Sequence, residues 1–138
     1  MQLRYQYRVY PTPGQQNRLA QAFGCARVVF NDALRARQVA YQAGLKLSDT
    51  DVQKLVVTEA KRTPERQWLG EVASVVLVQA SQDARRAYRN WFDSMSGKRK
   101  GRKVGAPRFR SRKDNRQAIR LTRNGFSIRA NRKLYVAK

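Results

Sequence analysis

The stretch that most limits the fold of this chain is SGKRKGRKVGAPRFRSRK, which runs from Ser96 to Lys113. It holds nine lysines and arginines, one aromatic residue and no acid. Cations cannot be buried without partners, because each loses its hydration when it leaves water. The stretch is therefore predicted to be a surface segment, and the packed core has to come from the residues before and after it. Its Pro-Arg-Phe sequence favours a defined loop over a featureless tail.

The whole chain of 138 residues carries a formal net charge of +21. Charge of one sign at this density destabilises a compact fold unless a partner neutralises it, and nucleic-acid phosphate is the commonest such partner. The sequence has no run of 18 apolar residues, no lipidation signal and no apolar N-terminal segment. We therefore expect a cytoplasmic protein, nucleoid-associated when bound to DNA, with no membrane partner and no small-molecule substrate.

Residues suited to catalysis or metal binding are scarce. The chain has one cysteine, Cys25, and no histidine, so a four-ligand Cys/His zinc site cannot form. The nine acids are scattered over predicted helix caps, helix faces and the position that directly follows the basic stretch, without the converging carboxylates that hold catalytic Mg²⁺. The sequence predicts no catalytic residue, no metal site and no cofactor in this chain.

Capping signals mark the first helices. Thr12, Pro13 and Gln15 form a capping-box pattern with proline at the first helical position. This predicts a helix from Pro13 to about Phe23, an interruption at Gly24, and a second helix from Cys25 to Gln42.

Two further helices follow. Ser48 and Asp51 repeat the capping pattern, and the last helix is predicted from about Glu71 to Met95. Its apolar stripe comprises Val72, Val76, Ala80, Ala84, Ala87 and Trp91, widened by Tyr88 and Phe92.

The two ends of the chain have the two-residue period of strands. Residues 2–10 alternate between apolar and polar side chains, and Pro11 stops the pattern. Asn124-Gly125 is a strong hairpin-turn signal that would place Leu121 opposite Ile128 and Ile119 opposite Ala130. A third short strand, KLYVA, is predicted after a turn at residues 131–132.

These elements predict an α+β fold. A lone N-terminal strand is not stable, so it is expected to pair with the C-terminal strands in a small antiparallel β-barrel of OB-like type, interrupted by an inserted helical bundle. The predicted boundaries are 1–11 and 104–138 for the barrel, 12–95 for a helix-turn-helix-like helical domain, and 96–103 for a basic linker. The chain stops at YVAK without a closing element, so we expect a truncated chain.

Three segments together resemble one family. YRVYPTPGQQNRLAQAFGCARVVFNDAL (residues 7–34), VVLVQASQDARRAYRNWF (75–92) and GKRKGRKVGAPRFRSRK (97–113) are similar, in order and spacing, to segments of the TnpB or OrfB-type proteins of bacterial insertion sequences. Those proteins are often called transposases. The family consists of RNA-guided DNA endonucleases related to type V CRISPR effectors.

The resemblance implies that separate domains of the parent protein bind nucleic acid and cleave it. A β-barrel wedge domain and a helical recognition domain hold the guide-RNA scaffold and read a short DNA motif next to the target. The nuclease domain, with its Mg²⁺ and Zn²⁺ sites, would lie outside residues 1–138, so this chain is not expected to be an enzyme by itself. The implied partners are guide RNA, double-stranded DNA and a separate catalytic half.

Candidate binding residues fall into two sets. The resemblance implies that Thr122 and the helix residues Ser74, Val75, Val78 and Gln79 face the DNA motif. Cations expected to bind RNA or phosphate are Arg4, Arg8, Lys98, Arg99, Lys100, Arg102, Lys103, Arg108, Arg110, Arg112, Lys113, Arg120 and Arg129.

Alternative functions fit the same composition. A ribosomal-type structural RNA-binding protein would share the charge but would not discriminate among DNA motifs. A free-standing DNA-binding regulator would use the helix from Cys25 to Gln42 in a helix-turn-helix and bind duplex DNA without RNA. A split nuclease would require a separate catalytic chain.

Overall fold

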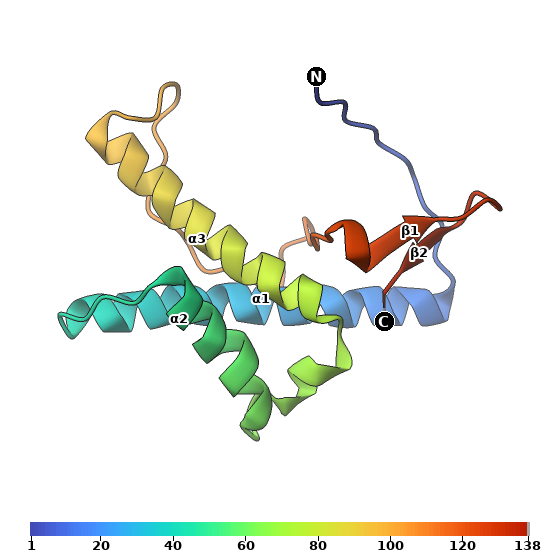
Figure 1. Ribbon diagram of the computed structural model, residues 1–138, viewed down its shortest axis with the longest axis horizontal. Coiled ribbons are helices and arrows are strands. Elements are labelled where there is room, and N and C mark those ends of the chain that lie inside the picture. The colour runs from blue at the N-terminus through green and yellow to red at the C-terminus, as the bar shows by residue number, and fades with distance from the viewer. Residues whose placement is uncertain (138) are drawn as a thin grey trace.

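A computed structural model describes residues 1–137 of the chain (Figure 1). Its helices are α1 (Pro13–Gln42), α2 (Asp49–Gln53) and α3 (Ser74–Ser96). Helix α2 continues as a π-helical segment at Lys54–Glu59 and a 3-10 turn at Ala60–Arg62, and another 3-10 helix spans Gln67–Glu71. After the basic stretch come a 3-10 turn at Arg123–Gly125 and two strands, β1 (Phe126–Ile128) and β2 (Leu134–Val136).

Helix α1 begins where the sequence predicts but is not interrupted. Thr12 accepts a hydrogen bond from the Gln15 N–H, and the Gln15 side chain accepts one from the Thr12 N–H, which confirms the capping box. The predicted break at Gly24 is wrong, because the helix is continuous over 30 residues. A single glycine costs a helix only about 1 kcal/mol, and the burial of Cys25, Ala26 and Val29 offsets that cost.

The core lies where α3 crosses α1 (Figure 1). Leu34 of α1, Leu77 of α3, and Val52 and Leu69 from the intervening segment are fully buried in one cluster. Asp49, the first residue of α2, receives Arg37 from α1 and Arg85 from α3, the latter at 2.6 Å between Nε and Oδ2. The predicted stripe on α3 is therefore correct over its first half, whereas Phe92 near its end is 53% exposed.

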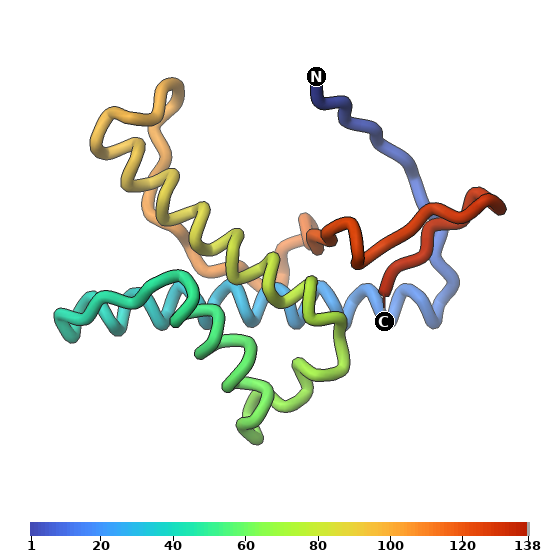
Figure 2. The backbone as a smooth tube through the Cα atoms, in the orientation of Figure 1, coloured from blue at the N-terminus to red at the C-terminus, as the bar shows by residue number. Residues whose placement is uncertain are grey.

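The predicted β-barrel is wrong. Within residues 1–137 the only sheet has two antiparallel strands, with Phe126 opposite Val136 and Ile128 opposite Leu134. Residues 1–10 form no strand, and the backbone tube in Figure 2 shows them leading away from α1. Strands of three residues offer too short a ladder to hold a third strand, so the alternating pattern of residues 2–10 produces an extended segment with exposed side chains.

The hairpin also turns at a different place from the one predicted. Asn124-Gly125 lies in a 3-10 turn that precedes β1, and the strands are joined through Arg129–Lys133, where Arg132 has a left-handed φ of 64°. The pairings of Leu121 with Ile128 and Ile119 with Ala130 are therefore wrong, although KLYVA does supply the strand β2. Tertiary packing explains the change, because Gly125 is buried against Val75 of α3 instead of turning in solvent.

Gly125 offers a direct test of this packing. An added Cβ would lie 2.9 Å from Cγ1 of Val75, closer than real contacts allow. We expect Gly125→Ala to cost about 1–3 kcal/mol by overcrowding. Because Val75→Ala removes the crowding atom, the double variant should lose less than the sum of the two single losses in a chemical denaturation cycle. Additive losses would mean that the turn does not rest on Val75.

Candidate nucleic-acid interface

The basic stretch begins by folding back on the end of α3. Gly97, with a left-handed φ of 80°, ends the helix. The Arg99 N–H then donates to the carbonyl of Asp93, and the Val104 N–H donates to Oγ of Ser94 at 3.0 Å. The cations between them therefore lie in a loop whose two ends are both tied to α3.

Helix α1 holds the later part of the stretch, at Phe109 and Arg110. The side-chain amide of Asn31 donates to the carbonyl of Arg110 at 3.0 Å, and its oxygen accepts from the Arg110 N–H at 2.8 Å. The Arg110 guanidinium lies 3.8 Å from the centre of the Phe30 ring, and Arg35 lies 5.9 Å from that of Phe109. Pro-Arg-Phe thus belongs to a segment that is fixed against α1.

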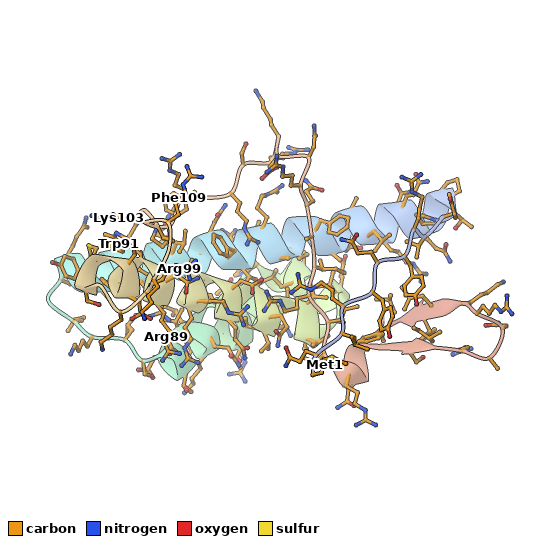
Figure 3. The ribbon with its side chains drawn as sticks, turned by 90° about the horizontal axis from the view of Figure 1, so that it is seen from above. Met1, Arg89, Trp91, Arg99, Lys103 and Phe109 are labelled. Atoms are coloured by element: carbon orange, nitrogen blue, oxygen red, sulfur yellow. The ribbon has the colours of Figure 1, made fainter. Side chains whose placement is uncertain are left out.

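Most predicted cations of the stretch are exposed. Figure 3 shows Arg99, Lys103 and Phe109 near Trp91 at one end of the molecule, away from Met1. Among the residues described here, none of these exposed cations is in an ion pair: Lys98, Arg99, Lys100, Arg102, Lys103, Arg108, Arg112 and Lys113. We call this set the loop cations. Their charge remains available to a polyanion.

The other predicted cations lie apart from the loop cations. Arg4 and Arg8 belong to the exposed N-terminal segment, whose free end lies far from the loop in Figure 2. Arg120 pairs with Asp83 of α3 at 3.1 Å, and Arg129 stacks on the Tyr135 ring at 4.6 Å. The thirteen cations predicted from the sequence are therefore not one surface.

The residues expected to face a DNA motif are brought together in part. Thr122 precedes the turn whose Gly125 packs on Val75, so this turn lies beside the first part of α3. Ser74 is exposed and accepts a hydrogen bond from Nζ of Lys61 at 3.1 Å. Val75, Val78 and Gln79 are half-buried on the same helix.

Sequence reasoning missed the α1 side of the interface. Phe23, Arg27, Asn31 and Arg35 follow one another at intervals of four residues, which places them along one face of a helix. This face carries the segment from Phe109 onward through the contacts of Asn31 and Arg35. The interval was visible in the sequence, but the expected break at Gly24 separated Phe23 from the rest.

Chemical groups for metal binding do not converge in the described part of the chain. No three His, Cys, Asp or Glu side chains lie together within residues 1–137. Burial, with a smaller effect from Glu71, raises the pKa of the Cys25 thiol, which is 2% exposed and packs as a core residue. None of the helices in this range is long and apolar enough to cross a membrane.

A helical domain that displays unneutralised cations on an anchored loop is typical of nucleic-acid-binding proteins. Residues 1–46 match the OrfB/IS605 family model, which is described as a helix-turn-helix domain. This range contains the N-terminal segment, all of α1 and the turn at Gly44.

Longer matches extend over the rest of the chain. It is 36% identical over 134 residues to a Streptomyces pristinaespiralis protein named "Putative RNA-guided DNA endonuclease", covering 97% of this chain and 31% of that protein. It is 29% identical over 111 residues to the Escherichia coli (strain K12) "Putative RNA-guided DNA endonuclease InsQ", covering 80% of this chain and 26% of that protein. The chain is thus a relative of the TnpB/OrfB-type proteins, as its motifs indicate, and spans between a quarter and a third of the length of these curated relatives.

Asn31 should control the order of the loop. We expect Asn31→Ala to speed tryptic cleavage after Arg108, Arg110 and Arg112, because it removes both hydrogen bonds to the Arg110 backbone. Asn17→Ala, an exposed change on the same helix, is the matched control. Limited proteolysis followed by mass spectrometry measures the sites, and equal cleavage of the two variants would contradict the anchoring role of Asn31.

Proposed function

We propose that this chain is the nucleic-acid-binding part of a TnpB-like RNA-guided DNA endonuclease, which binds the guide-RNA scaffold and recognises a short DNA motif beside the target. The observation that carries this proposal is the double hydrogen bond between Asn31 and Arg110, which holds an acid-free basic segment in a fixed place. A fixed set of cations can match the phosphate spacing of a folded RNA, whereas a mobile set would bind any polyanion.

The loop cations would contact phosphates and position the RNA. If about eight of them engage, affinity should fall by about 10³-fold or more between low and moderate salt, because each contact releases a condensed counterion. Specificity would come from the folded shape of the RNA and from its unpaired bases.

DNA recognition is assigned to the surface that joins Thr122 to the start of α3. Thr122, Ser74 and Gln79 offer hydrogen-bonding groups, and Val78 offers an apolar contact of the kind that a thymine methyl makes. Val75 supports the turn that carries Thr122 through its contact with Gly125. The helix-turn-helix match and the names of the relatives support DNA binding by this part of a TnpB-like protein.

Catalysis is assigned to the remainder of the parent protein. Mg²⁺ and Zn²⁺ would belong to that part, supplied in the same chain or as a separate catalytic half. Adding such a half together with the guide RNA and Mg²⁺ should give cleavage of motif-bearing target DNA that neither piece gives alone.

A competition for RNA tests the first half of the proposed function. Residues 1–138 would be titrated, at two salt concentrations, with structured RNA from the end of the parent element, unrelated RNA of equal length and random duplex DNA. We expect the cognate RNA to bind about tenfold or more tightly at the higher salt. Equal affinities for all three ligands, falling together as salt rises, would mean that the chain binds nucleic acid only through non-specific charge.

Selection from a randomised duplex library tests the second half, with and without the cognate RNA. Enrichment of one short motif only when RNA is present supports the proposed function. Enrichment without RNA would favour a free-standing DNA-binding regulator, the alternative that the helix-turn-helix match supports. Tight RNA binding without any motif would favour a structural RNA-binding protein.

A further inference from the structure

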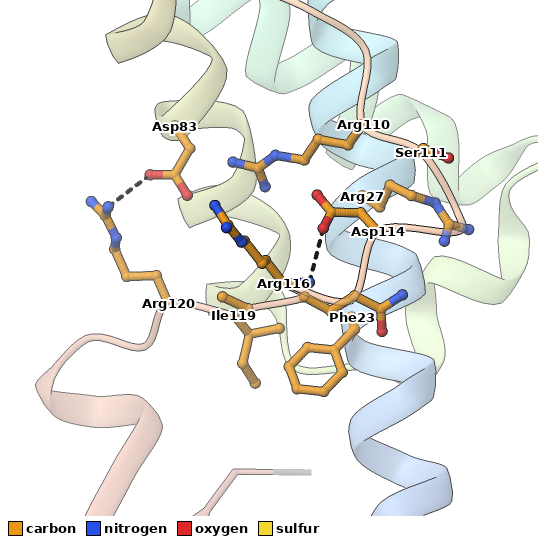
Figure 4. A pocket seen from close by; sticks show the side chains of 11 residues that line it. Phe23, Arg27, Asp83, Arg110, Ser111, Asp114, Arg116, Ile119 and Arg120 are labelled. Atoms are coloured by element: carbon orange, nitrogen blue, oxygen red, sulfur yellow. Dashed lines mark hydrogen bonds and ion pairs between the residues drawn. The ribbon is translucent and has the colours of Figure 1, made fainter. Parts of the chain in front are cut away.

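A pocket of about 410 Å³ lies between α1, α3 and the segment from Arg110 to Arg120 (Figure 4). Helix α1 contributes Phe23 and Arg27, and α3 contributes Asp83. The segment contributes Arg110, Asp114, Arg116 and Arg120. Its volume is within the range of roughly 300–1,000 Å³ typical of sites for small ligands.

Cations outnumber acids in this pocket. Four arginines face two aspartates, and Asp83 is already paired with Arg120 at 3.1 Å. Arg27, Arg110 and Arg116 form no ion pair within residues 1–137. The guanidinium groups of Arg110 and Arg116 lie close together (Figure 4). Two such groups without carboxylate partners, held together in a hollow, attract a phosphate group more strongly than the same groups spread over a flat surface.

Hydrogen-bonding groups of other kinds line the same hollow. The Ser111 hydroxyl accepts from the Lys113 N–H and keeps its own hydrogen to donate. Asp114 uses one carboxylate oxygen, Oδ1, to accept from the Arg116 N–H at 2.9 Å and keeps its second oxygen for a donor on a ligand. Sugar hydroxyls and base amino groups are such donors.

An aromatic surface completes the pocket. Figure 4 shows the Phe23 ring beside Ile119 at the edge of the hollow, with the head groups of Arg110 and Arg116 on the side of Asp83. Base–aromatic stacking requires a flat apolar face of this kind, and it does not depend on which base is present. A simple anion has no flat apolar group that could stack on this ring.

We propose that this pocket holds one unpaired nucleotide of the bound nucleic acid, with its phosphate on Arg110 and Arg116 and its base on Phe23. This inference rests on the proposed function and adds to it a preference for a single-stranded position. A paired base enters less readily, because it first has to leave its stack at a cost of a few kcal/mol.

Variants with the same change in net charge distinguish binding in the pocket from general electrostatic attraction by the whole protein. The pocket variant is Arg110→Gln with Arg116→Gln, and the control is Lys46→Gln with Arg62→Gln, two exposed cations outside the pocket. The probes are single strands of RNA and DNA of about 12 nucleotides and a duplex of the same length. We expect the pocket variant to bind single strands about 30-fold more weakly, the control to lose less than about threefold, and the duplex to respond alike to both.

A change at Phe23 tests the stacking itself. Phe23→Leu should weaken binding of the single strand about tenfold and leave binding of a fully abasic strand unchanged, because only the base contact is lost. Phe23→Tyr keeps the ring and should retain binding. The fluorescence of a 2-aminopurine strand should be quenched by the wild type and by Phe23→Tyr but not by Phe23→Leu. Melting temperatures verify that each variant is folded.

Several outcomes would overturn this assignment. Equal losses for the pocket and control variants would mean that the arginines act only through net charge. Inorganic phosphate that displaces the single strand as well as adenosine monophosphate does would show that only an anion binds. Either result leaves RNA and DNA-motif binding intact, whereas a wild-type chain that binds no nucleic acid at all would refute the proposed function instead. A difference between the RNA and DNA strands identifies the strand that supplies the nucleotide.

Discussion

Replacement of Leu77 by alanine is expected to lower the free energy of unfolding by about 3–5 kcal/mol. Leu77 is 0% exposed and lies on α3 within the cluster that joins α3 to α1. The loss combines the transfer of the removed methyl groups with the cavity left behind, because the helices on both sides are held by other buried residues. For a chain of this size the melting temperature should fall by about 10 °C.

Phe92→Ala is the matched control on the same helix. Its ring is 53% exposed and stacks on Trp91 at 5.1 Å between ring centres. Exposed aromatic contacts contribute little, so the expected loss is below about 1 kcal/mol. Urea denaturation at moderate salt, where like-charge repulsion is screened, measures both variants. A larger loss for Phe92 than for Leu77 would mean that the helix packs through its other face.

Neutralising part of the loop should have the largest effect on binding. The triple variant Lys98→Gln, Arg99→Gln, Lys100→Gln removes three exposed cations that have no acidic partner in the described residues. If all three contact phosphate, the slope of log affinity against log salt should decrease by about 2–3, and affinity at low salt should fall about a hundredfold.

The control for this variant removes the same charge from the other side of the fold. Lys46→Gln, Lys54→Gln and Arg62→Gln change exposed cations in and around α2, so net charge falls equally while the loop is intact. Fluorescence anisotropy at several salt concentrations gives both slopes. Equal slopes for the two triple variants would show that the loop makes no contacts of its own.

The helices could be predicted from the sequence because their signals are local. Thr12 and Ser48 cap through residues three positions away, and both capping boxes are present. The stripe of α3 repeats at helical spacing, and Val76, Ala80 and Ala84 are buried as expected. The prediction of a break at Gly24 was wrong because the free energy that one glycine costs a helix is smaller than the stabilisation from packing of the residues that follow it.

The sheet could not be predicted because its pairing depends on contacts between distant parts of the chain. Asn124-Gly125 is a good hairpin signal, yet the burial of Gly125 against Val75, 50 positions earlier, places it in a 3-10 turn. The alternation of residues 2–10 indicates only an extended backbone, and nothing in it specifies a partner strand.

The charged residues of the candidate site could be predicted from the sequence, but the residues of α1 that hold them in place could not. The loop cations were evident from composition, but Asn31 is one amide in a helix and bonds to a backbone 79 positions away. Arg27 and Phe23 lie on the same face of α1 and became informative only when α1 proved to be continuous.

The uninterrupted helix α1 sets the length of nucleic acid that can lie along it. Its 30 residues span about 45 Å, which equals about 13 steps of stacked bases at about 3.4 Å each. The two hydrogen bonds of Asn31 hold the basic stretch near the middle of this span. A nucleic acid that lies along the whole of α1 therefore needs about 13 stacked steps, and shorter fragments can cover only part of the helix.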